Sequence, residues 1–474
     1  MAVHPYPSVD AILRAADGIL RIEEDAVEVL DADGLRADLI DRLIATAVFG
    51  DEEAWAASRW LIRVAAPAAG AYPASIHDLY LACGRGDYAN KTTPAINVRG
   101  LTFDVARTVL QAAHEVDNKM VVFELARSEM GYTEQRPGEY ASNILAAAIK
   151  DGWQGPVFIQ GDHYQLSASK YATDPEGETT GVRELIAEAI AAGYFNIDVD
   201  ASTLVDLDRS SVSEQQRDNY ERTAELTEVV RDHQPAGIEV SVGGEIGEVG
   251  TTNSTEEDLH AFMAGYVAEL RRRGEARGRD LTGISKISVQ TGTSHGGVPL
   301  ADGTVAEVSV DFATLGQLSE AARSGYGLGG AVQHGASTLP ESAFDRFAQA
   351  GAVEVHLATA FQNQIYDSAA FPADLLEDIY AHLAANHASE RKEGQTDAQF
   401  YYTTRKRGFG PFKRQLWDLP GETRGAIMDE LRPSFVLIMQ RLGVAGSGDL
   451  AERFTQRVDV PVPAPEVLRA GAAR

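Results

Sequence analysis

The chain has 474 residues, of which 44% are hydrophobic and 24% are charged, a composition typical of globular proteins. Acidic residues outnumber basic ones by 70 to 42 and give a formal charge of −28, which opposes binding to nucleic acid. The single cysteine, Cys83, excludes an intrachain disulfide. Because no secretory signal and no apolar run of about 18 residues is found, we expect a cytoplasmic protein without a membrane partner.

The first part of the chain, residues 1–93, is predicted to be a helical extension. Between residues 8 and 70, apolar side chains recur at spacings of three and four, as in VDAILRAADGIL and LRADLIDRLIATAV. This is the period of an amphipathic helix. The segment PAAGAYP then interrupts the pattern.

The central part, residues 94–372, changes rhythm: short β-rich runs alternate with amphipathic helical stretches. The eight runs begin at residues 94, 119, 155, 194, 237, 286, 329 and 352. Strand–helix alternation predicts a parallel sheet with helical crossovers. Eight repeats predict a (β/α)8 barrel, which typically has about 250 residues. An open doubly wound sheet is the alternative, and the absence of a dinucleotide-binding glycine fingerprint weakens it.

The last part, residues 373–474, is predicted to be a second helical extension. It contains one unusual insert, QFYYTTRKRGFGPFKRQLWDLP at residues 399–420, which is basic within an acidic chain. Its basic residues are Arg405, Lys406, Arg407, Lys413 and Arg414.

Ionisable residues stand at the ends of several predicted strands. They are Asp162, His163, Asp198, Asp200, Glu245, His295, His334 and His356. The carboxyl ends of the strands of a parallel barrel meet at one face, where active sites are found. Any one such histidine is more often structural than a ligand. Four together, flanked by glycine or small residues in GDH, SHGG and QHGAS, predict a site for Zn²⁺ or a similar divalent ion, held by three histidines and a carboxylate.

These motifs resemble those of the class II, metal-dependent ketose-bisphosphate aldolases, over roughly residues 94–365. GDHYQ resembles the family's Asp-His strand end, and GGEIGEVG its glutamate strand followed by glycines. GTSHGG resembles its Gly-Thr-Ser-His-Gly, while VQHGAS and VHLATAFQ resemble its Leu-His-Gly-Gly-Ser and Asn-x-Ala-Thr segments. The four matches occur in the family's order.

The resemblance implies a role for each residue. The implied metal ligands are His163, His295, His334 and Glu245, with Asp200 at an alternative metal position. Asp162 would exchange protons at the aldehyde carbonyl, and His356 would contact the enediolate. Substrate and phosphate would bind at Asn97, Gly296, Gly335, Ser337 and Thr359. The implied substrate carries a dihydroxyacetone phosphate unit, and a bound cation would stabilise the enediolate formed when its carbon–carbon bond breaks.

Three features depart from the family pattern. The second proton-transfer carboxylate is unassigned, because Glu256 and Glu257 fit the first turn of a capped helix and Glu248 is a further candidate. His356 stands where the family has asparagine. A lysine after the His-Gly motif and an early strand-end serine are absent, with Glu124 or Ser128 in the serine's region. The basic insert either supplies a substitute phosphate site or is a solvated loop.

A metal-dependent aldolase acting on a phosphorylated ketose is the leading hypothesis. A metal-dependent sugar epimerase is the alternative, because the same metal would enolise or retro-aldolise a ketose before one centre is reset. A non-catalytic, aldolase-like subunit is the third hypothesis, which the retained histidines argue against. By analogy we expect a homodimer.

Overall fold

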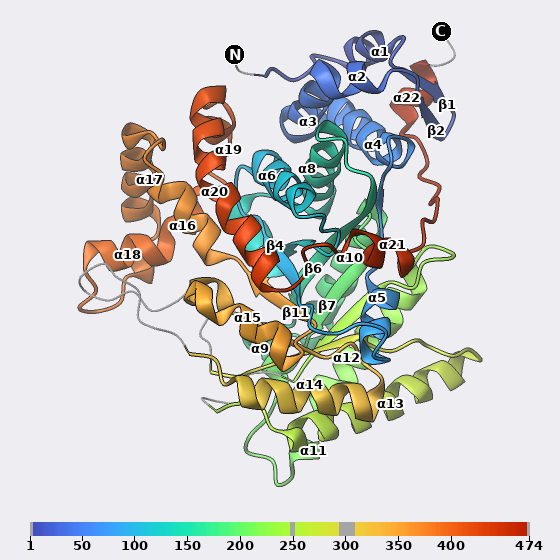
Figure 1. The fold of residues 1–474 in the computed structure, drawn as a ribbon, viewed down its shortest axis with the longest axis vertical. Coiled ribbons are helices and arrows are strands. Elements are labelled where there is room, and N and C mark those ends of the chain that lie inside the picture. The colour runs from blue at the N-terminus through green and yellow to red at the C-terminus, as the bar shows by residue number, and fades with distance from the viewer. Residues whose placement is uncertain (1–2, 247–251, 293–308, 472–474) are drawn as a thin grey trace.

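The computed structural model describes residues 3–246, 252–292 and 309–471 of the chain. In this part, eight parallel strands form a closed barrel surrounded by helices (Figure 1). The strands are β4 (Thr93–Asn97), β5 (Val122–Ala126), β6 (Gly155–Gln165), β7 (Asn196–Asp200), β8 (Ser241–Glu245), β9 (Lys286–Val289), β10 (Ala331–Gln333) and β11 (Glu354–Leu357). Their order is β6-β5-β4-β11-β10-β9-β8-β7, and β6 pairs with β7 to close the ring. The predicted (β/α)8 barrel is confirmed.

Helices connect consecutive barrel strands, as the alternating pattern predicts. They are α6 (Thr102–Glu115), α7 (Arg127–Thr133), α8 (Pro137–Lys150), α9 (Ala168–Thr173), α10 (Pro175–Ala192), α11 (Val212–Gln215), α12 (Arg217–His233), α13 (Glu256–Arg277), α14 (Phe312–Tyr326) and α15 (Asp345–Ala350). The side chains of Thr255 and Asp258 form a capping box at the start of α13. Glu256 and Glu257 are therefore exposed residues of a first helical turn, as predicted. Glu248 lies outside the described residues.

The N-terminal extension is only partly helical. Its elements are α1 (Val9–Ala16), β1 (Leu20–Glu23), β2 (Ala26–Val29), α2 (Ala32–Gly34), α3 (Ile40–Phe49), α4 (Glu52–Ala68), β3 (Ala71–Pro73) and α5 (His77–Gly84). The prediction of helix was wrong for residues 20–29, which form an antiparallel hairpin. The stretch LRIEEDAVEV alternates apolar and charged residues, a strand period, with Leu20 and Val27 buried. The added strand β3 pairs with β6 on the outside of the barrel.

The elements of the C-terminal part are helices, which contact both the barrel and the N-terminal extension. After α16 (Thr359–Asp367) come α17 (Ala373–Asn386), α18 (Asp397–Thr404), α19 (Lys413–Trp417), α20 (Gly421–Arg441), α21 (Gly448–Arg453) and α22 (Glu466–Gly471). The turn after α18, Arg405–Gly408, packs against α7. The last helix, α22, lies beside α1 and α4, so both ends of the chain meet at one end of the molecule (Figure 1).

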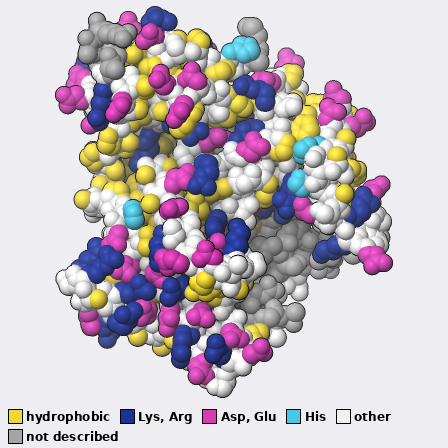
Figure 2. All heavy atoms as spheres, turned by 180° about the vertical axis from the view of Figure 1, so that it is seen from behind, with side chains coloured by type: hydrophobic (Ala, Val, Ile, Leu, Met, Phe, Trp, Pro, Cys, Tyr) yellow, Lys and Arg dark blue, Asp and Glu magenta, His cyan; other side chains and the backbone are white. Residues whose placement is uncertain are grey.

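The surface is charged but mixed in sign. On the face drawn in Figure 2, acidic and basic side chains are interspersed. Within the residues that the structure describes, no helix is long and apolar enough to cross a membrane.

Candidate active site

A bulge in β6 explains how neighbouring residues both face the barrel mouth. Adjacent residues of a regular strand point to opposite faces. The pairing of β6 with β7 shifts register between Gly161 and Tyr164, and His163 has a left-handed backbone with φ of 40°. A Cβ at position 161 would lie 2.5 Å from the ring of Tyr164, so glycine is required there. The bulge lets Asp162 and His163 enter the same cavity.

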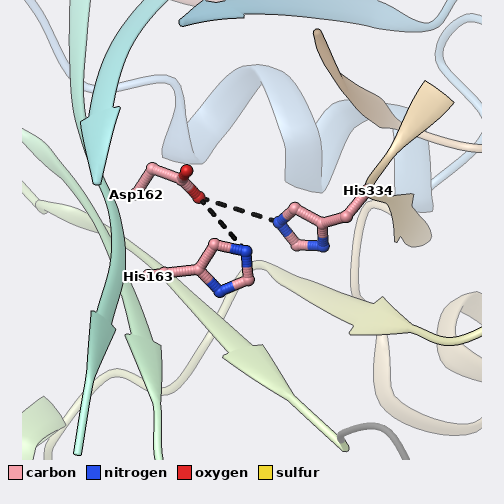
Figure 3. A group of neighbouring side chains, drawn as sticks. All are labelled: Asp162, His163 and His334. Atoms are coloured by element: carbon pink, nitrogen blue, oxygen red, sulfur yellow. Dashed lines mark ion pairs between the residues drawn. The ribbon is translucent and has the colours of Figure 1, made fainter. Parts of the chain in front are cut away.

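Asp162, His163 and His334 form one cluster (Figure 3). The Asp162 Oδ1 atom lies 3.8 Å from His163 Nε2 and 3.7 Å from His334 Nε2. The two imidazole rings have centroids 4.2 Å apart. His163 comes from β6 and His334 directly follows β10, so the barrel joins residues that are far apart in the sequence.

Two further predicted ligands lie on the other side of the His163 ring. His163 Nδ1 is 3.1 Å from Asp200 Oδ2 and 3.1 Å from Glu245 Oε2. His163, Asp200 and Glu245 offer donor atoms within 4.8 Å of one another. The structure therefore brings together four of the five predicted ligands, and His295 lies outside the described residues.

The pKa values in this cluster follow from burial and from the neighbouring charges. Burial lowers the pKa of His163, but the carboxylates of Asp162 and Glu245 outweigh it and raise that pKa well above its ordinary value. Burial and the positive charges of His356 and His163 hold the pKa of His334 well below its ordinary value, so His334 is a neutral imidazole. Burial and Asp200 raise the pKa of Glu245 to about 7.

The cluster opens into a cavity of about 510 Å³. The predicted phosphate ligands Gly335, Ser337 and Thr359 line it, and Thr359 is the first residue of α16. Backbone N–H groups at a helix N-terminus attract anions. Asn97 also lines the cavity, donates a hydrogen bond of 2.7 Å to Glu129 and keeps its buried Oδ1 without a partner. Gly296 lies outside the described residues.

A buried ionic network lies below the cavity. His356 Nε2 is 2.6 Å from Glu354 Oε1, and its Nδ1 is 3.0 Å from Glu124 Oε2. Lys286, only 1% exposed, binds Glu354 and lies 2.9 Å from Asp198 Oδ2. Asp198, which the sequence placed among the strand-end residues, therefore pairs with the Lys286 ammonium group and not with His163.

The basic insert reaches the cavity of its own chain through Lys406. This side chain lines the cavity, and its ammonium lies 5.7 Å from the centre of the Tyr132 ring. Lys406 makes no ion pair with a described carboxylate. The other basic residues are engaged: Arg405 pairs with Asp367, Arg407 with Glu390 and Lys413 with Glu139, and Arg414 lies over Phe49.

Sequence reasoning missed several residues of the site. Arg99 lines the cavity, pairs with Glu129 at 2.7 Å and donates a hydrogen bond to Gln362 at 2.8 Å. Arg127 and Lys170 also line it. Arg99 follows β4 by two residues, which was an available signal, because every barrel strand end points to this face.

Comparisons with known proteins agree with this architecture. Residues 75–403, more than half of the chain, match the family model described as fructose-bisphosphate aldolase class-II. No match was found among curated protein sequences.

Three solved structures illustrate the likeness. A probable tagatose 6 phosphate kinase from Sinorhizobium meliloti is 18% identical, with a TM-score of 0.51, over 81% of this chain and 98% of that chain. A fructuronate-tagaturonate epimerase from Cohnella laeviribosi is 12% identical, with a TM-score of 0.51, over 91% and 90%. A fructose-bisphosphate aldolase from Campylobacter jejuni is 16% identical, with a TM-score of 0.45, over 80% and 96%. At these identities the first two likenesses bear on the fold alone.

Proposed function

Because the chain belongs to the class-II fructose-bisphosphate aldolase family, we propose that it is a metal-dependent aldolase that cleaves or forms a carbon–carbon bond of a phosphorylated ketose. The observation that carries this proposal is the cluster of Asp162, His163 and His334 at the mouth of the barrel. Imidazole nitrogens and carboxylate oxygens in that arrangement are suitable ligands for a divalent cation.

The donor set fits Zn²⁺ or a similar ion. His163 and His334 would hold it in the group that includes Asp162, and Glu245 and Asp200, which adjoin the other nitrogen of His163, offer an alternative carboxylate position. The neutral imidazole of His334 has a lone pair to donate, and the buried Asp162 Oδ1 has no hydrogen-bond partner. When bound, the ion would supply Lewis-acid stabilisation of the negative charge that develops on the substrate carbonyl oxygen.

Asp162 would move the proton of the substrate hydroxyl. Burial raises the pKa of Asp162, but His163 and His356 outweigh it and hold that pKa well below its ordinary value. The group is therefore a carboxylate at neutral pH. It can accept the hydroxyl proton as the carbon–carbon bond breaks, and in the synthetic direction it returns that proton to the new alkoxide.

Anion-binding groups at the cavity would hold the phosphate. The α16 N-terminus with Ser337 and Gly335 suits the phosphate of a dihydroxyacetone phosphate unit. Lys406 and Arg99 add positive charge to the same cavity. Burial, together with the charge of Arg99, lowers the pKa of Lys406, and an anion beside it would restore its ordinary affinity for protons.

Deuterium exchange tests the proposal directly. The protein is incubated with dihydroxyacetone phosphate in D2O, and the loss of the C3 proton is followed by NMR with and without a chelator. We expect exchange that the chelator abolishes and added Zn²⁺ restores. A protein that holds metal but gives no exchange would refute action on this triose phosphate. A protein without metal or exchange would favour a non-catalytic subunit.

A sugar epimerase is the second candidate, and His356 is the observation that favours it. This histidine replaces the asparagine of the family pattern and lies 3.2 Å from Asp162 Oδ1, so two groups able to exchange protons adjoin at one place. Product analysis separates the two functions. An aldolase releases a triose, whereas an epimerase returns a ketose of unchanged length with deuterium at one carbon.

A further inference from the structure

The end of β5 brings into the cavity a carboxyl group that the mechanism above does not use. Glu124 is 1% exposed and lines the cavity wall. Its Oε2 accepts a hydrogen bond of 3.1 Å from Gln160 and lies 3.0 Å from His356 Nδ1. The same His356 nitrogen is 3.2 Å from Asp162 Oδ1. Glu124 and Asp162 therefore both adjoin one imidazole nitrogen, beside the same cavity.

The groups that face Glu124 set its protonation. The charged groups that face Glu124 are Asp162 on β6 and His356 and Glu354 on β11. The neighbouring residue on β4, Asn97, is neutral. Burial raises the pKa of Glu124 most, the negative charge of Asp162 raises it further, and His356 lowers it, with a net value of about 7. A carboxyl group of this kind both donates and accepts protons at neutral pH.

We propose that Glu124 is the second proton-transfer residue of the site and serves the enediolate carbon, while Asp162 serves the hydroxyl. This inference rests on the proposed function. It fills the role that Glu256 and Glu257 do not fill, because both are exposed in the first turn of α13.

The step balances without a co-reactant. In cleavage, Asp162 takes the hydroxyl proton, the carbon–carbon bond breaks, and its electron pair forms the enediolate. Glu124 then donates its proton to the enediolate carbon and becomes a carboxylate, and the carbonyl re-forms. At the end of the step Asp162 carries an extra proton and Glu124 lacks one. The His356 nitrogen adjoins both carboxylates, so it can pass a proton from Asp162 to Glu124 and restore the starting state.

The test compares two matched substitutions. Glu124→Gln keeps an oxygen that accepts from His356 but removes the exchangeable proton. Glu225→Gln makes the same change at a buried, ion-paired residue of α12 outside the cavity. Each holoenzyme is assayed for exchange of the C3 proton of dihydroxyacetone phosphate in D2O, for bound metal and for Tm.

We expect Glu124→Gln to slow exchange by about 10²- to 10⁴-fold, the usual contribution of a general acid or base, with metal content unchanged. Glu225→Gln should exchange at the wild-type rate. Exchange at the wild-type rate in Glu124→Gln would overturn the inference, whereas absence of exchange in the wild type would overturn the proposed function instead.

A second variant covers the case in which Glu124→Gln does not fold. Glu124→Asp retains a carboxyl group set back by one methylene. It should keep part of the exchange, with an altered pH dependence of the rate near pH 7. An unchanged rate and pH profile in Glu124→Asp would also overturn the inference, because a shortened proton carrier cannot act identically.

Discussion

Replacing Lys286 with methionine should destabilise the fold, because it removes an ammonium group from a buried ionic network. The ammonium binds Glu354, lies 2.9 Å from Asp198 Oδ2 and donates a hydrogen bond of 2.7 Å to Gln160. Lys286 and Glu354 are 1% and 0% exposed. Methionine fills a similar volume but removes the ammonium group that Glu354 and Asp198 share, and leaves His356 as their remaining neighbouring cation.

The magnitude follows from this burial. Breaking a buried ion pair by removing one partner costs about 3–5 kcal/mol. With an unfolding entropy of about 2.1 cal/mol/K per residue and 474 residues, Tm should fall by roughly 3–5 °C. The pH dependence has a definite sign. Without Lys286, the pKa values of Glu354 and Asp198 in the folded state rise, so the fold binds protons more tightly than the unfolded chain and the Tm deficit shrinks as the pH is lowered.

Thermal unfolding followed by circular dichroism between pH 8 and pH 5.5 would measure both effects. Lys119→Met is the control, since Lys119 pairs with Glu452 at a partly exposed position where an ion pair contributes at most about 1 kcal/mol. The double variant K286M/E354Q should be more stable than K286M, because it removes one stranded carboxylate. Equal Tm values for K286M and K119M at every pH would refute the reasoning.

Three further predictions concern the site. His334→Ala should abolish turnover and lower metal content, measured by atomic emission, while changing the circular dichroism spectrum little; full activity would contradict the metal site. Lys406→Met should raise KM for a phosphorylated substrate by roughly 10- to 100-fold, the equivalent of one charged hydrogen bond, whereas the exposed Lys392→Met should not. Metal affinity, measured by titration, should fall as the pH drops below about 7. The pKa of Glu245 is about 7 and the pKa of His163 is raised well above its ordinary value, so at lower pH protons occupy the atoms that would bind the metal. An affinity independent of pH would exclude both groups as ligands.

The barrel was predictable because its signals are local. Short β-rich runs alternate with helical stretches along residues 94–372, and this alternation can be recognised in the sequence without the tertiary fold. The hairpin at residues 20–29 was missed because it lies between two helical stretches. Its two strands have only four residues each, so their alternation of apolar and charged residues is too short to be distinguished from the helical pattern on either side. Its second strand, β2, packs on α4, a long-range contact that the sequence pattern does not show.

The site was predictable only where topology gathers residues. Barrel geometry alone requires strand ends to converge, which located His163, His334 and Glu245. Lys406 could be named only as a member of a basic insert, because its position depends on how the turn after α18 packs on α7. Lys286 was missed because a charged residue at the start of a strand usually faces solvent, and only closure of the barrel places it inside.

The two departures from the family pattern at the strand ends of β5 and β11 are best understood together. Glu124 lies, with Ser128, in the region where the pattern has serine, and His356 stands where it has asparagine. The Glu124 and His356 side chains meet at 3.0 Å. His356 also adjoins Glu354 and Asp162, so the pair belongs to a larger buried network in which removing one charge costs several kcal/mol. Made together, the two departures leave the net charge beside the metal ligands close to that of the uncharged pair. They also place two groups that exchange protons near neutral pH side by side, which under the proposed function provides a proton route beside the metal ligands.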